Sequence, residues 1–205
     1  MVRILRVILI AVFALSLLSA PASAGMLYDN GPDPGNILGR PISLGNSVTD
    51  NFVLVSDAQV GWLVFSTWLS PGDTPISVDW TVTSLPFGGA MEGSGTALLT
   101  ILSASSQANS FGYFVYTVSA PISVSLTAGT YWLQLGNEVV TNGDAGFWGQ
   151  NNGASLAREH GVGAIPSEAF TLFDDSGITP EPGTIALFGS GLVLLAAGMR
   201  RKAHR

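Results

Sequence analysis

Large apolar residues alternate with polar ones along several stretches of the chain. The clearest is Ile76-Ser77-Val78-Asp79-Trp80-Thr81-Val82-Thr83, and Ile122-Ser123-Val124-Ser125-Leu126-Thr127 repeats the pattern. Successive side chains of a strand point to opposite faces, so a period of two predicts strands with one buried and one solvated face. Further candidates, rich in β-branched and aromatic residues, are 51–55, 59–69, 96–103, 111–118, 130–135, 146–150 and 169–173.

The connections between these stretches contain turn-forming residues. Ser70-Pro71-Gly72-Asp73 and Asn142-Gly143-Asp144 are two of them, while residues 84–95 and 149–163 have the composition of long loops. About nine short strands without a helical period predict an all-β fold, an antiparallel β-sandwich of jelly-roll form, with a closed barrel as the alternative. We expect this domain to occupy residues 25–178, flanked by an N-terminal signal peptide helix and a C-terminal transmembrane helix.

The N-terminal residues 1–24 have the three parts of a signal peptide. Arg3 and Arg6 precede an apolar run, residues 7–18, and Ala22-Ser23-Ala24 provides small residues before Gly25. Twelve helical residues rise only about 18 Å, which is too short to span roughly 30 Å of hydrocarbon. We therefore expect signal peptidase to cleave after Ala24, following export through the Sec machinery, rather than an uncleaved anchor.

The C-terminal residues 179–205 combine an extended peptide, an apolar span and a basic cluster. Pro180-Glu181-Pro182 lacks two backbone donors, so this segment joins neither helix nor sheet. Residues 183–199 contain no charge and are just long enough to cross a membrane as a helix. Arg200, Arg201 and Lys202 follow at once, which predicts a cytoplasmic C-terminus.

In its three parts and their order, this tail resembles the PEP-CTERM sorting signal of Gram-negative bacteria. The resemblance implies recognition of Pro180-Glu181-Pro182 by an exosortase in the inner membrane, and transfer to the cell surface or extracellular matrix. Residues 126–133, Leu-Thr-Ala-Gly-Thr-Tyr-Trp-Leu, also look like a hairpin common in exported β-sandwiches that carry such a tail.

The charged residues are segregated along the chain. The formal net charge is −6, but residues 25–180 contain only Arg40 and Arg158 against thirteen acidic residues, a charge of −11. A nucleic-acid-binding protein needs a basic face, so this class is excluded. The absence of cysteine excludes disulfides, thiolate nucleophiles and thiolate metal sites.

Few residues suggest catalysis. His160 is the one histidine between the two end segments, and no Gly-x-Ser-x-Gly motif accompanies it, so a solvated loop histidine is the better interpretation. A glycosidase needs two carboxylates about 5–10 Å apart. Almost any acidic protein contains such a pair, so the scattered acidic residues are weak evidence for this activity. We therefore expect a protein that is not an enzyme and needs no cofactor.

Asp29 and Asp33 suggest a calcium site. They lie in Asp29-Asn30-Gly31-Pro32-Asp33, which is rich in oxygen side chains, and an acidic domain attracts a hard cation. The segment lacks the EF-hand order, so a plain turn is the alternative.

Three tryptophans are candidates for contact with a glycan. Trp132 shares a strand face with Thr130 and Gln134, and Trp68 or Trp148 would extend the platform if near. The alternative is that a loop or the second sheet covers these rings, because large apolar residues are seldom left exposed.

These features predict an exported protein held briefly in the inner membrane and then sorted to the cell surface or matrix. A structural or adhesive component is the leading interpretation. A carbohydrate-binding module for exopolysaccharide and a secreted glycoside or ester hydrolase are the alternatives.

Overall fold

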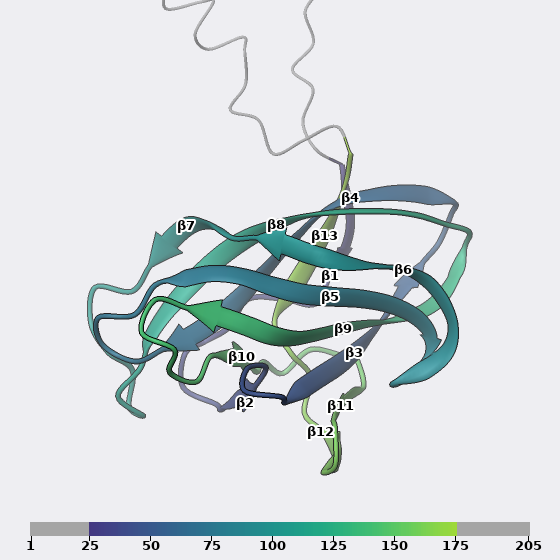
Figure 1. Ribbon diagram of the computed structural model, residues 1–205. Helices are drawn as coiled ribbons and strands as arrows, with labels where there is room; N and C mark the ends of the chain where they lie inside the picture. The colour runs from purple at the N-terminus through teal and green to yellow at the C-terminus, as the bar shows by residue number, and fades with distance from the viewer. Residues whose placement is uncertain (1–24, 176–205) are drawn as a thin grey trace, which may run out of the picture. The chain divides into compact units, whose positions relative to one another are not determined.

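The computed structural model describes residues Gly25–Asp175, in which every regular element is a β-strand (Figure 1). The strands form two antiparallel sheets, so the predicted all-β class is confirmed. Among these residues no helix is long and apolar enough to cross a membrane. The expected signal peptide, the expected transmembrane helix and the segment Pro180-Glu181-Pro182 lie outside the described residues.

Sheet A has seven strands: β1 (Met26–Asp29), β2 (Gly39–Pro41), β4 (Ala58–Leu69), β7 (Thr100–Ala104), β8 (Phe114–Leu126), β10 (Phe147–Gly149) and β13 (Phe170–Asp174). Strand β4 is central, with β8 along one side and β13 followed by β10 along the other. The outer strands are β1, β2 and β7.

Sheet B has six strands: β3 (Ser47–Leu54), β5 (Pro75–Leu85), β6 (Gly88–Leu98), β9 (Gly129–Val140), β11 (Ala157–Glu159) and β12 (Gly163–Ile165). Its order is β12-β11-β3-β9-β5-β6. The rings of Phe87, between β5 and β6, and His160, between β11 and β12, lie 5.4 Å apart although β9 and β3 separate these strands. Sheet B is therefore strongly curled, as a half-barrel (Figure 1).

The inner faces of the two sheets share one hydrophobic core. Phe52 of sheet B and Phe170 of sheet A meet edge to face with ring centroids 6.5 Å apart. Leu133 and Leu135 on β9 are fully buried, as are Leu63 and Phe65 on β4. Burial of these alternating side chains, at roughly 25 cal/mol per Å² of apolar surface, is the main force that holds the sheets together.

Two expectations about the connections are wrong. Residues 126–133 do not form a hairpin, because β8 belongs to sheet A and β9 to sheet B. Residues 96–103 do not form one strand, because the chain leaves β6 and enters β7 of the other sheet at Leu99. Local alternation marks strand residues but carries no information on which sheet a strand joins.

The expected loop at 84–95 is also wrong, because most of it is β6. Its glycines, which suggested a loop, leave room for the core: a Cβ on Gly93 would lie 3.1 Å from Val124, and one on Gly95 would lie 3.3 Å from Trp80. The turn before β6 is only Pro86-Phe87, where Phe87 takes a left-handed conformation with φ of 55°. Within the expected loop 149–163, the short strand β11 forms.

Candidate functional site

Trp132 lies on the outer face of sheet B. Strands β3 and β5 flank β9, and the cross-strand neighbours of Trp132 are Asn51 on β3 and Thr83 on β5. Tyr131 and Leu133 on either side of it are buried in the core, whereas Trp132 itself is only half-buried. The indole ring is thus partly exposed on the outer face of sheet B.

Trp68 and Trp148 do not extend this surface, which corrects the expected platform. Trp148 is fully buried in the core, where its Nε1 donates to the Ala169 carbonyl at 2.9 Å. Trp68 faces outward from sheet A but is 1% exposed, because Phe111 stacks on it with ring centroids 5.6 Å apart. Neither ring has a free face for a sugar.

A polar groove of about 240 Å³ lies on sheet B, and its lining begins two positions along β9 from Trp132. We define it by its lining residues, Gly45, Asn46, Ser47, Asp79, Thr81, Gln134, Gly136 and Asn137. Gln134 follows Trp132 by two positions on β9, so both side chains lie on the same face. A second hollow, of about 250 Å³, shares Asp79 and Thr81 with the groove and continues it over β6.

Asp79 is the charged centre of the polar groove. Its carboxylate accepts hydrogen bonds from Thr96 Oγ1 and from Asn137 Nδ2, the latter at 2.9 Å. Asn137 has a φ of 48°, and the register between β5 and β9 shifts at this point. Such irregularities redirect side chains at functional sites. Here the groove presents carboxylate, amide and hydroxyl groups, which together can donate and accept hydrogen bonds.

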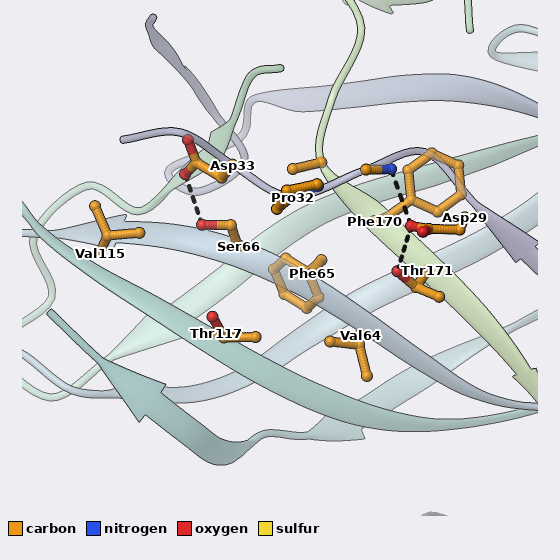
Figure 2. A pocket seen from close by; sticks show the side chains of 12 residues that line it. Asp29, Pro32, Asp33, Val64, Phe65, Ser66, Val115, Thr117, Phe170 and Thr171 are labelled. Carbon is orange, nitrogen blue, oxygen red and sulfur yellow. Dashed lines mark hydrogen bonds between the residues drawn. The ribbon is translucent and has the colours of Figure 1, made fainter. Parts of the chain in front are cut away.

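Asp29 and Asp33 lie at a different pocket, on the outer face of sheet A. This pocket of about 320 Å³ is lined by the segment after β1 together with residues of β4, β8 and β13. Figure 2 shows Asp29 and Asp33 at its two ends, each hydrogen-bonded to a different strand.

The expected calcium pair is therefore not brought together. Asp33 accepts from Gly35 N, Ser66 Oγ and Trp68 Nε1, and Asp29 accepts from Gly31 N and Thr171 Oγ1. Both carboxylates act as turn and strand acceptors. In the part of the chain that the structure describes, no three acidic or histidine side chains converge on a metal position.

His160 is exposed in the turn between β11 and β12. Its ring contacts Phe87 edge to face, and among residues 25–175 no serine or carboxylate is hydrogen-bonded to its imidazole. This arrangement places no acid–base pair around the histidine.

The sequence did not reveal a buried polar network at one end of the core. Asn30 Nδ2 lies 2.6 to 3.3 Å from four possible acceptors, in Asp50, Ser155, Ser167 and the Glu168 carbonyl, and its two hydrogens are shared among them. Asp50 and Glu168 are fully buried. One feature of the sequence indicated a buried acid. In the alternation Val48, Asp50, Phe52, the side chain of Asp50 lies on the same inward face as two large apolar residues.

Burial shifts the protonation of these acids. It raises the pKa of Asp50 to about 6, and the pKa of Glu168 well above its usual range, with the nearby Asp50 charge adding to the effect. Burial likewise raises the pKa of Glu138 to about 8. Glu138 reaches across the core to Thr67 Oγ1, which donates to it at 2.9 Å. These carboxyls bond to partners inside the core and line none of the three pockets described above.

Comparison with known proteins identifies the C-terminal tail. Residues 179–202 match the PEP-CTERM protein-sorting motif. No curated protein matches the chain. The chain thus carries the PEP-CTERM sorting motif, which marks it as an exosortase substrate that is exported and sorted to the cell surface.

Proposed function

We propose that the domain is a non-catalytic structural or adhesive component of the cell surface or extracellular matrix. The sorting motif at residues 179–202 carries this proposal, because it assigns the destination of the domain. The buried acids add support, since Glu138 and Asp50 bond to partners inside the core and line none of the three pockets described above. Signal peptidase would release the N-terminus at Gly25, and the membrane would hold the chain until exosortase acts.

The proposed form of the domain is a jelly roll. Most connections pass from one sheet to the other, as between β3 and β4 and between β8 and β9, although β5 and β6 stay in one sheet. Connections of this kind between two packed antiparallel sheets are typical of jelly rolls.

A carbohydrate-binding module is the second candidate. Trp132 and the polar groove lie together on sheet B, and this pairing supports the assignment because an aromatic ring packs on the apolar face of a sugar while amides and carboxylates bond its hydroxyls. The ligand class would be a neutral or hydroxyl-rich exopolysaccharide.

Expression of the full chain with and without the matching exosortase tests the destination. We expect protein with its N-terminus at Gly25 outside the cell only when the exosortase is present, as measured by mass spectrometry of each fraction. Retention of a chain ending at Arg205 in the inner membrane of both hosts would contradict the proposal.

Co-sedimentation with purified exopolysaccharide tests the second candidate. We expect Trp132→Ala to weaken binding about tenfold, and the matched variant Trp62→Ala, at a half-buried tryptophan of sheet A, to leave it unchanged. An equal loss of binding in both variants, or no binding by the wild type, would contradict glycan binding at the polar groove. Neither result would contradict the structural role.

A further inference from the structure

Rows of outward residues cross sheet B from β3 through β9 and β5 to β6. In the first row the successive cross-strand partners are Ser47, Gly136, Asp79 and Thr96. In the second row they are Thr49, Gln134, Thr81 and Ser94. The polar groove lies over β3, β9 and β5, and the hollow that continues it reaches β6. We call the two together the extended groove.

The extended groove is longer than a site for a single sugar ring. It crosses four neighbouring strands, and a strand spacing of about 4.8 Å makes the three intervals about 14 Å long. Asn46 at one end and Thr96 at the other are both exposed, and a Cβ on Gly45 would meet no atom within 4 Å. A linear polymer can therefore pass through the groove, with internal units of the chain in contact with the protein.

Gly136 keeps the middle of the extended groove hollow. It lies between Ser47 and Asp79 in the first row, and a Cβ at this position would lie 3.2 Å from the Cβ of Ser47. Glycine inside a strand weakens the strand and often marks a place where a ligand approaches the backbone closely. The missing side chain leaves room for a ligand between the polar groups on either side.

The groove offers side chains and not backbone groups. Strands β3, β9, β5 and β6 pair with one another along it, so an extended peptide finds no free strand edge to join. Within residues 25–175 no hydrogen bond is made by the side chains of Ser47, Thr81 and Gln134. These free hydroxyl and amide groups fit a ligand that itself carries many hydroxyl groups.

Charge indicates which polysaccharides fit. Among the residues that line the extended groove, Asp79 is the one charge, and residues 25–180 together carry −11. The Asp79 carboxylate accepts from Thr96 and Asn137, and a carboxylate has sites for further bonds from sugar hydroxyls. A polymer of uronic acids would bring like charges against Asp79, which disfavours binding, whereas a neutral polymer meets no such repulsion.

We propose that the extended groove binds internal units of a neutral, linear polysaccharide, which crosses the strands of sheet B between Asn46 and Thr96. Asp79 is the residue that selects against uronic-acid polymers. The ring of Trp132, two positions from Gln134 on the same face, adds an apolar contact beside this path. This inference rests on the second candidate function and deepens it, because it names the class of polymer and the path of its chain.

Affinity electrophoresis of the full-length chain in a mild detergent tests the proposal. The gels contain a linear glucan, mannan or galactan, and each is compared with the same polymer after oxidation of its primary alcohols to carboxylates. We expect at least one neutral polymer to retard the protein, and its oxidised form to bind about tenfold more weakly because of repulsion from Asp79.

Asp79→Asn separates the charge from the shape of the groove. We expect it to weaken binding of the neutral polymer about fivefold, as for one lost hydrogen bond, and to reduce the discrimination against the oxidised form. Gln134→Ala should weaken binding of both forms. Asp57→Asn is the matched control, because Asp57 is an exposed carboxylate in the turn between β3 and β4, at the opposite end of β3 from the groove. We expect it to bind as the wild type does.

Three results would overturn the inference. They are no retardation by any neutral polymer, equal or stronger retardation by the oxidised forms, and wild-type binding by both Asp79→Asn and Gln134→Ala. If the wild type still co-sediments with exopolysaccharide and Trp132→Ala weakens that binding, the second candidate function stands and only the path and class of polymer are wrong. If the wild type binds no exopolysaccharide, the second candidate function fails as well.

Discussion

The outer face of sheet A carries Trp68 and the outer face of sheet B carries Trp132. The first ring is covered, and the second is partly exposed. Trp68 on β4 is covered by Phe111 from the segment after β7 and is bonded to Asp33 from the segment after β1. Trp132 on β9 is half-buried, and the lining of the polar groove begins two positions along the strand. Sheet A covers its ring with connecting segments, while sheet B leaves its ring partly exposed to solvent.

This difference depends on the connecting segments and not on the strands. Both tryptophans belong to long strands with neighbours on both sides. Two connecting segments fold over sheet A at Trp68. Gly39 and Gly149 let the backbone lie close to the Trp68 ring, because a Cβ on either would lie within 3.2 Å of it. An aromatic residue at an outward position is therefore a functional candidate only if no loop covers it.

The largest expected effect comes from Trp68→Ala. This substitution removes a buried ring and its hydrogen bond to Asp33, so we expect the free energy of unfolding to fall by about 3–5 kcal/mol. Urea unfolding followed by circular dichroism measures the change. A loss below about 1 kcal/mol would mean that the cover over sheet A adds little to stability.

The buried carboxyl groups between the two sheets should make the stability of the domain depend on pH. The folded pKa of Glu138, about 8, lies above the ordinary value of a glutamate, so the folded state holds a proton that the unfolded state releases. Stability is then greatest below about pH 4.5 for this group, and is lost as pH rises through 8, at up to about 1.4 kcal/mol per pH unit.

Thermal unfolding from pH 5 to 9 measures this slope. Asp50, with a pKa of about 6, adds to it in the lower half of the range. In Glu138→Gln, which keeps a polar group near Thr67, we expect the fall between pH 6 and 8 to be smaller by the part due to Glu138, while the part due to Glu168, whose pKa burial also raises, remains. An unchanged slope in this variant would assign the pH dependence to other groups.

Asp33→Ala should have the next largest effect. Trp68 Nε1 and Ser66 Oγ would lose their acceptor in a covered site, which costs about 1–3 kcal/mol of unfolding free energy. Asp29→Ala is the control at the other end of the same pocket, where the carboxylate is exposed, and we expect a loss below about 1 kcal/mol.

The same proteins test the calcium alternative. We expect EDTA to leave the unfolding midpoint of the wild type unchanged, because the Asp33 oxygens already accept three hydrogen bonds. A midpoint that falls with EDTA and recovers with calcium would show that the pocket binds the cation.

The smallest effect on stability is expected for Trp132→Ala, about 1 kcal/mol, because the ring is only half-buried. The same variant should lose part of the fluorescence that acrylamide quenches, since Trp68, Trp80 and Trp148 are shielded and only Trp62 remains partly exposed. If Trp132→Ala lost as much stability as Trp68→Ala, Trp132 would contribute to the fold as a covered ring does, which would contradict the difference between the two sheets.

Several features followed from the sequence alone. The alternation at 76–83 and at 130–135 marked real strands, because the side-chain period is a local property of extended backbone. The order of Pro180-Glu181-Pro182, an apolar span and a basic cluster marked the sorting motif, because its parts are contiguous in the chain.

Only the tertiary structure decided which sheet each strand joins and which faces are covered. Leu99 lies between a strand of sheet B and a strand of sheet A, with no local sign of the change. The bond from Trp68 to Asp33 joins residues 35 positions apart. The bulge at Asn137 turned Glu138 into the core, against the simple alternation of β9. Alternation gives each strand two faces, but contacts between residues distant in the chain determine which face meets the core, a loop or solvent.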